Sequence, residues 1–115
     1  SNAVIKNKKK DNSKINLSSA KFIGLDKITA KTSEIIVKLG ETAKFGPLEI
    51  KVLKCGKIDS DVMNNNVAYL QVKDSSENQN EKVFIFNGWT FSSDPTIAPF
   101  DHAIYDLQLV NCGKV

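Results

Sequence analysis

The sequence predicts an all-β fold: a small antiparallel β-sandwich or a partly open barrel of about seven strands. Three observations support this prediction. Apolar and polar residues alternate in several short runs, turn signals separate these runs, and the helical period is not sustained in any segment. The chain has 115 residues, 41% of them hydrophobic, which is enough for one domain with a core of its own.

The clearest predicted strand covers residues 48–55. Leu48, Ile50 and Val52 alternate with charged residues, which is the period of a half-buried strand. The alternation then slips by one position, so we expect a β-bulge near Val52-Leu53. The last strand is expected at 104–112, with apolar residues on one face and polar residues on the other.

Shorter runs predict the other strands. The runs at 22–23 and 27–30 are expected to form one strand. The others are expected at 35–37, 42–45, 67–73 and 82–86. The last of these is apolar on both faces after Lys82, so we expect it to be central and buried. Residues 64–66 are expected to form a turn and 74–80 a solvent loop. A helix over 20–28 is the alternative to the first strand, but Gly24 disfavours it.

The domain is expected to span residues 20–115. Residues 1–3 resemble the remnant of a cloning vector, and residues 4–19 are polar, rich in lysine and without periodicity, which predicts a disordered leader. Five lysines and one acid give the first fourteen residues a charge of +4, whereas the rest of the chain carries −1. The leader is therefore the part that could make a weak contact with an anionic surface.

Composition excludes several classes of function. All sixteen basic residues are lysine, and arginine, the usual reader of guanine edges and phosphates, is absent. One histidine and two cysteines are too few for a structural zinc site. No apolar run is long enough to span a membrane as a helix, and no nucleotide-binding motif is present. We therefore expect no nucleic-acid partner, transmembrane segment, cofactor or bound metal.

The two cysteines are expected to form a disulfide between Cys55 and Cys112, with two buried thiols as the alternative. A bridge between them would close a loop that chain-entropy arguments value at about 4 kcal/mol. Such bonds persist in oxidising compartments. The disulfide therefore predicts a periplasmic or otherwise extracytoplasmic protein whose signal peptide has been removed.

The stretch that is richest in candidate site residues follows the strand at 82–86. The loop at 88–103 carries large apolar side chains, and burial of each contributes about 1.5–3 kcal/mol, so we expect it to be ordered against the domain. Trp89 is expected to close the open end of the β-core, with an exposed stacking surface for a sugar or peptide as the alternative. The tentative binding residues are Trp89, Phe91, Phe100, His102, Tyr105 and Asp106.

His102 is the only histidine and the only candidate for acid–base chemistry. With Asp101 or Asp106 as the acid and Ser92 or Ser93 as the nucleophile it could form a hydrolase triad. The strained nucleophile turn G-x-S-x-G of one such class is absent. We therefore expect no catalytic residue, and expect His102 and Asp106 to hydrogen-bond the backbone of the loop instead.

Motifs in the same stretch resemble a known family. Gly88-Trp89-x-Phe91-x-Ser93-x-Pro95, then Asp101-His102, Tyr105-Asp106 and Cys112, are similar to an uncharacterised, mainly alphaproteobacterial family, the domain of unknown function numbered 2155. The similarity covers about residues 25–112. This chain departs from the family pattern at Thr90, Ala103 and Gln108. The family is generally exported, so the resemblance implies an envelope location, and it implies no catalytic residue.

Together these observations leave the function unknown but favour one class. We expect a non-enzymatic binding or scaffolding module of the bacterial cell envelope that contacts another envelope protein through the ordered aromatic loop. A binder of a small ligand or glycan, using Trp89 and Phe91, is the alternative. A hydrolase centred on His102 is a further alternative function.

Overall fold

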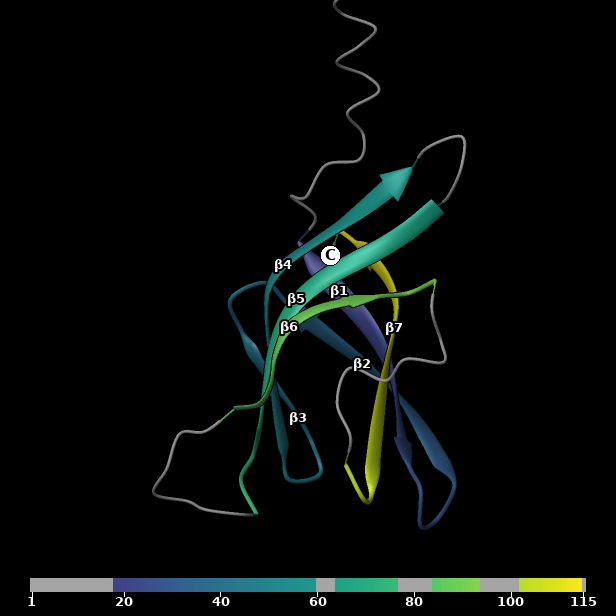
Figure 1. Ribbon diagram of the computed structural model, residues 1–115, viewed down its shortest axis with the longest axis vertical. Helices are drawn as coiled ribbons and strands as arrows, with labels where there is room; N and C mark the ends of the chain where they lie inside the picture. Colours follow the sequence, from purple (N-terminus) through teal and green to yellow (C-terminus); the bar gives the residue numbers. More distant parts are fainter. Residues whose placement is uncertain (1–17, 60–63, 77–83, 94–101, 115) are drawn as a thin grey trace, which may run out of the picture.

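The computed structural model describes residues 18–59, 64–76, 84–93 and 102–114. These residues form a sandwich of two antiparallel sheets that are not closed into a barrel (Figure 1). The all-β prediction is therefore confirmed, and the described part of the chain contains no helix. The strands are β1 (Ser19–Asp26), β2 (Lys31–Lys38), β3 (Thr42–Phe45), β4 (Leu48–Asp59), β5 (Asn64–Asp74), β6 (Phe84–Phe91) and β7 (Tyr105–Gly113).

The first sheet has the strand order β2-β1-β7 and the second has the order β3-β4-β5-β6. The chain therefore builds one hairpin of the first sheet, crosses to make the whole second sheet, and returns through β7 to pair with β1. Because β1 and β7 are distant in sequence, the first sheet forms only when the two ends of the domain meet. Between the sheets lies one core, whose largest fully buried side chains are Phe22, Leu48, Ile50, Leu70, Leu107 and Leu109.

The predicted bulge in β4 is confirmed. The pairing of β4 with β5 shifts between Val52 and Lys54, so Leu53 is the extra residue. Val52 and Cys55 both face the core, whereas the Leu53 side chain is 39% exposed. The bulge turns the second half of β4 and brings Cys55 into the core.

The first strand differs from its prediction. Ala20, Phe22 and Gly24 alternate inward along β1, so this segment is a strand and the helical alternative is wrong. Residues 27–30 form a turn instead of continuing the strand. The Asp26 carboxylate fixes this turn because it accepts hydrogen bonds from the backbone N–H groups of Ile28 and Thr29, at 2.9 and 3.2 Å.

Two predictions about the second sheet are wrong. Residues 64–66 begin β5 instead of forming a turn, and the side chains of Asn65 and Asn66 make the contacts described below. The strand expected to be central and buried is β6, an edge strand whose first residue, Phe84, is 37% exposed. Apolar residues of β6 face outward as well as inward. Apolar residues on both faces of this strand therefore did not mean that it lies in the middle of the sheet.

Candidate functional site

The single histidine joins the two sheets at one end of the sandwich. His102 Nε2 lies 2.8 Å from Oδ2 of Asp74, the last residue of β5. The Lys27 ammonium, from the β1–β2 turn, donates to the His102 carbonyl oxygen at 2.6 Å. His102 directly precedes β7, so this cluster ties the end of one sheet to the start of the returning strand in the other.

Both ring nitrogens of His102 are engaged. Nδ1 accepts hydrogen bonds from the backbone N–H groups of Ile104 and Tyr105, at 3.0 and 3.2 Å. Nδ1 therefore carries no proton, and the Nε2 proton points at the Asp74 carboxylate. The prediction that His102 hydrogen-bonds the loop backbone is confirmed.

Asp74 is a site residue that the sequence analysis missed. Its side chain is only 2% exposed, although the segment was expected to be a solvent loop. Burial raises the pKa of Asp74, but hydrogen bonds from Ser76 and His102 to the ionised form lower it by more, so its pKa lies below the ordinary value. The acid that faces His102 is therefore Asp74, while Asp101 lies outside the described residues and Asp106 is half-buried in β7.

Tyr105 is partly buried against the core. Its ring meets Phe45 edge to face with centroids 5.3 Å apart and lies 5.4 Å from the His102 ring. Gly46, with φ of +59°, makes room for it, because a Cβ at that position would lie 2.9 Å from the Tyr105 ring. This end of the molecule is filled by packed rings.

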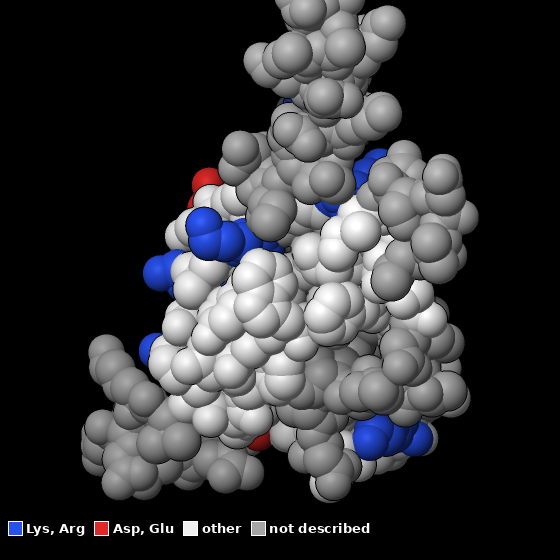
Figure 2. Space-filling view, turned by 45° about the horizontal axis from the view of Figure 1, so that its top comes forward, with Lys and Arg blue, Asp and Glu red and all other residues white. Residues whose placement is uncertain are grey.

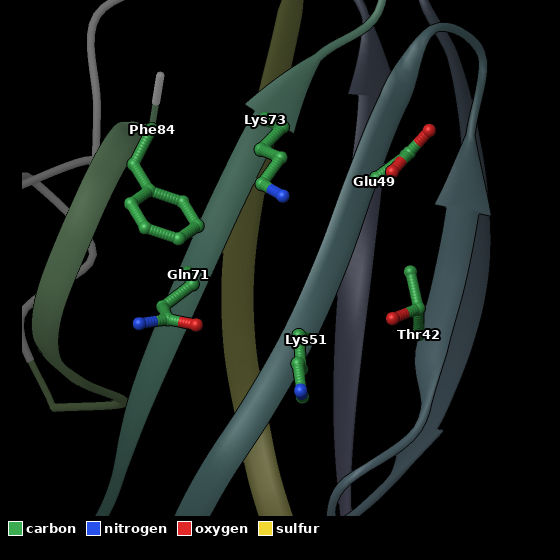
Figure 3. A pocket seen from close by; sticks show the side chains of 6 residues that line it. All are labelled: Thr42, Glu49, Lys51, Gln71, Lys73 and Phe84. Carbon is green, nitrogen blue, oxygen red and sulfur yellow. The ribbon is translucent and has the colours of Figure 1, made fainter. Parts of the chain in front are cut away.

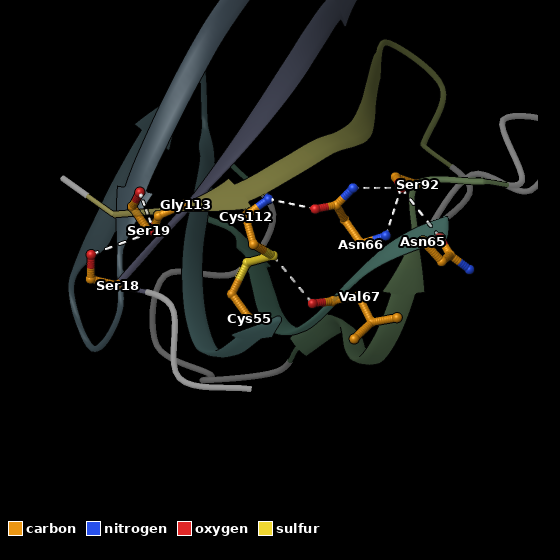
Figure 4. Close-up of a disulfide and its surroundings, with 9 residues drawn as sticks. All are labelled: Ser18, Ser19, Cys55, Asn65, Asn66, Val67, Ser92, Cys112 and Gly113. Carbon is orange, nitrogen blue, oxygen red and sulfur yellow. Dashed lines mark hydrogen bonds between the residues drawn. A yellow bond between two sulfur atoms is a disulfide. The ribbon is translucent and has the colours of Figure 1, made fainter. Parts of the chain in front are cut away.

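The opposite end of the sandwich carries the disulfide, and the predicted pairing is confirmed. Cys55 of β4 is joined to Cys112 of β7, so the bridge connects the two sheets (Figure 4). The Asn66 side-chain oxygen accepts the Cys112 backbone N–H at 3.0 Å, and its amide nitrogen donates to the Ser92 hydroxyl at 3.3 Å. Ser92 also donates to Asn65, at 3.2 Å.

These contacts separate the residues of the hypothetical triad. Ser92 lies beside Asn66, whereas His102 lies beside Asp74, eight residues further along β5. Eight residues of strand span about 26 Å. Ser93 is held near the same end as Ser92 because its backbone N–H donates to Asn65. The structure therefore does not bring either serine to His102.

The aromatic residues of β6 lie in a strand and not in a loop. Trp89 is 43% exposed and Phe91 is 44% exposed, both on the outer face of the second sheet. Trp89 meets Tyr69 of β5 edge to face, with centroids 5.3 Å apart, and the Tyr69 hydroxyl donates to Asn87 at 2.8 Å. Trp89 therefore does not close the end of the core, because it is half-exposed on the face of the sheet.

We call Tyr69, Trp89 and Phe91 the aromatic face. Phe100, the remaining aromatic candidate, lies outside the described residues. A broad uncharged area bordered on one side by lysines is visible over β5 and β6 in Figure 2. The five described candidate residues thus fall into two groups, with Trp89 and Phe91 on this face and His102, Tyr105 and Asp106 near the start of β7.

The outer faces of the two sheets differ in charge. The strand register and the alternation of side chains show which charged residues lie on each outer face. The outer face of the second sheet carries four lysines and one acid, a net charge of +3. The outer face of the first sheet carries two lysines and two acids, whose charges cancel. The residues of the second sheet are Lys44, Lys51, Lys54, Lys73 and Glu49, and those of the first are Lys21, Lys38, Glu34 and Asp106.

None of the described residues lies in a helix that could cross a membrane.

Comparison with known proteins places the chain in a family. Residues 20–112 match the family model described as an uncharacterised protein conserved in bacteria, domain of unknown function 2155. An uncharacterised protein of Rickettsia prowazekii is 34% identical over 97 residues, which cover 84% of this chain and 62% of that protein. No solved structure matches significantly. The chain therefore belongs to the uncharacterised bacterial family defined by domain of unknown function 2155.

Proposed function

We propose that this chain is a non-enzymatic binding or scaffolding module of the bacterial cell envelope, and that its contact surface is the aromatic face. The observation that carries the proposal is the exposure of Trp89 and Phe91, at 43% and 44%, on one strand of the second sheet. Burial of large aromatic side chains supplies much of the free energy of protein–protein contacts, and exposed apolar patches mark such sites.

The aromatic face is held in place before any partner arrives. The Tyr69 hydroxyl is fixed by Asn87, and the Tyr69 ring supports Trp89 edge to face. Side chains fixed by a sheet and by each other lose little conformational freedom on binding. This favours a recognition surface over a residual patch of unburied core.

The absence of a catalytic role is part of the proposal. It is supported by the engagement of both His102 nitrogens, with Asp74 at Nε2 and two backbone N–H groups at Nδ1. A general base needs a nitrogen that can reach the proton of a substrate or nucleophile. The role of His102 is then to position the chain that enters β7.

The envelope location is supported by the Cys55–Cys112 bridge, because structural disulfides persist in oxidising compartments. We propose another envelope protein as the partner of the aromatic face. A weak contact of the lysine-rich leader with an anionic surface would add to this interaction and is a proposal of the same kind.

Site-specific photo-crosslinking in native cells tests the proposed contact surface. A photoreactive phenylalanine analogue replaces Phe91 in one variant and Ile36 in another, which is 58% exposed on the other sheet and serves as the matched control. We expect an adduct with one envelope protein from position 91 and none from position 36. Equal adducts from both positions, or an adduct with a cytosolic protein, would contradict the proposal.

The alternative is a glycan ligand, and one observation favours it. Amide side chains lie beside the rings: Asn87 accepts hydrogen bonds from Tyr69 at 2.8 Å and from Gln71 at 3.4 Å. Rings flanked by amides are the groups that stack on sugars and bond their hydroxyls. Trp89 is the only tryptophan in the chain, so its fluorescence reports directly on a ligand that stacks there.

A further inference from the structure

A shallow pocket lies on the outer face of the second sheet, beside the aromatic face. It has a volume of about 220 Å³, and its side chains come from all four strands of the sheet (Figure 3). This volume is below the roughly 300–1,000 Å³ of pockets for drug-sized ligands, so the pocket takes one small ring at a time. Its lining residues are Thr42, Glu49, Lys51, Gln71, Lys73 and Phe84.

The pocket holds two cations, Lys51 and Lys73, and one acid, Glu49, which is the cross-strand neighbour of Lys73. Among the described residues, no carboxylate lies within ion-pair distance of Lys51 or Lys73, whereas Lys21 forms an ion pair with Glu34. The Lys73 ammonium lies 5.1 Å from the centre of the Phe84 ring instead. The surrounding sheet face has a balance of +3, as described above. Charge complementarity therefore points to an anionic ligand.

The other lining groups narrow the class of anion. Phe84 gives the pocket an apolar wall, whereas Thr42 and Gln71 offer both donors and acceptors. The Glu49 carboxylate accepts hydrogen bonds and repels a multiply charged group such as phosphate. The ligand that fits carries one negative charge, several hydroxyl groups and an apolar ring face. A sugar ring bearing one carboxylate has these properties.

A row of side chains leads from this pocket to the aromatic face. The Gln71 amide donates to Asn87, which also accepts from the Tyr69 hydroxyl, and the Tyr69 ring meets Trp89. The distance along β5 from Lys73 to Tyr69 is four residues, or about 14 Å. This length accommodates a chain of a few sugar rings, with its acidic end at the lysines and a following ring on Trp89.

We propose that this pocket binds an acidic sugar residue of an envelope polysaccharide, with Lys51 and Lys73 holding its carboxylate and Phe84 contacting its ring. The inference rests on the binding role proposed above and adds a second ligand class to it, since it needs no protein partner. An acidic protein segment is the competing occupant, and the test includes it.

Isothermal titration calorimetry of the full chain tests the site with three probes: trigalacturonic acid, neutral maltotriose and a hexaglutamate peptide. We expect saturable binding of trigalacturonic acid, weaker binding of both other probes, and a blue shift of Trp89 fluorescence. Lys51→Gln and Lys73→Gln should each weaken binding by up to about five-fold, because each removes one solvent-exposed ion pair with the ligand carboxylate. Lys38→Gln, on the outer face of the first sheet, is the matched control and should leave affinity unchanged.

Three results would overturn the inference. Equal affinity for maltotriose would remove the role of the charge, and equal affinity for hexaglutamate would remove the role of the sugar ring. Equal losses in Lys38→Gln and Lys73→Gln would show unspecific attraction to lysine. Absence of trigalacturonic acid binding, with crosslinking from position 91 intact, would reject the sugar site and leave the proposed function standing. Loss of crosslinking from position 91, with trigalacturonic acid binding intact, would reject the proposed contact with an envelope protein and leave the sugar site standing.

Discussion

The Nε2 atom of His102, in the segment that leads into β7 of the first sheet, lies 2.8 Å from Oδ2 of Asp74, the last residue of β5 in the second sheet. The pair sits at the end of the sandwich that the Cys55–Cys112 bridge does not reach. One end is therefore held by a covalent bond and the other by a hydrogen bond to a buried carboxylate. Three of the predictions below concern these two ties.

Loss of the Asp74 carboxylate should destabilise the domain. Asp74→Ala removes the acceptor of the His102 and Ser76 hydrogen bonds at a buried position, so we expect a loss of about 2–4 kcal/mol in the free energy of unfolding. Urea denaturation followed by circular dichroism measures it. Glu34→Ala breaks the exposed ion pair with Lys21 and should cost less than about 0.5 kcal/mol. Similar losses in both variants would mean that the buried pair contributes little.

Stability should fall in acid because of the same carboxylate. The pKa of Asp74 is lowered in the folded state, so its contribution is fully present above the unfolded value of about 4 and is lost as the pH falls through the folded value. Urea midpoints measured between neutral pH and acid should therefore decline more steeply in the natural chain than in Asp74→Asn. Parallel pH profiles of the two proteins would rule out this role of Asp74.

Gly46 should tolerate alanine less well than Gly40. Both have positive φ, at +59° and +82°, so alanine strains the backbone at each by about 1–2 kcal/mol. At Gly46 the added Cβ also meets the Tyr105 ring, whereas nothing lies within 4 Å at Gly40. We expect Gly46→Ala to lower the free energy of unfolding by about 1–3 kcal/mol more than Gly40→Ala does. Thermal or urea unfolding of the two variants measures the difference. If the two variants are equally stable, the ring of Tyr105 moves aside freely.

Reduction of the disulfide should lower the melting temperature. Cys55 and Cys112 are 57 residues apart, and the entropy of closing such a loop in the unfolded chain corresponds to about 4 kcal/mol. Calorimetry with and without reductant measures the effect. The Cys55→Ser/Cys112→Ser variant should melt low in both conditions and show no response to reductant. A natural chain that melts at the same temperature with reductant would exclude a stabilising bridge.

Asn66 should matter for stability although its side chain is polar. Its side-chain oxygen accepts the backbone N–H of the buried residue Cys112. Asn66→Ala leaves that donor without this acceptor, so we expect a loss of about 1–3 kcal/mol in urea denaturation. Asn87→Ala, at an exposed position, is the control and should cost about 0.5 kcal/mol or less. The role assigned to Asn66 fails if its variant is as stable as the control.

Local patterns predicted the strands that have one buried face. Alternation located β4, its bulge and β7, because Leu48, Ile50, Leu107 and Leu109 all face the core in register. Asn64–Asn66 was misassigned because asparagine is common in turns, whereas here Asn65 and Asn66 bond Ser92 across the sheet. Local propensity carries no information about such partners.

The candidate site was only partly predictable for the same reason. His102 was identified as a residue that bonds the loop backbone, but its acid partner Asp74 lies 28 residues earlier, in a segment that reads as solvated. Trp89 and Phe91 were placed in the loop that follows the strand expected at 82–86, and only the pairing with β5 shows that they stay in the strand. Pairing between distant segments decides both cases.

The bridge between β4 and β7 also determines how the domain responds to mechanical load. Tension applied to the chain beyond Gly113 passes Gly113, which pairs with Ser19, and then reaches Cys112, from which the sulfur atoms transmit it into β4, the long strand paired with β3 and β5. The hydrogen bonds between β7 and β1 are thereby shielded, so β7 cannot be peeled away one residue at a time from its C-terminal end. In its oxidised form the domain therefore resists unravelling that starts at the C-terminal end of β7.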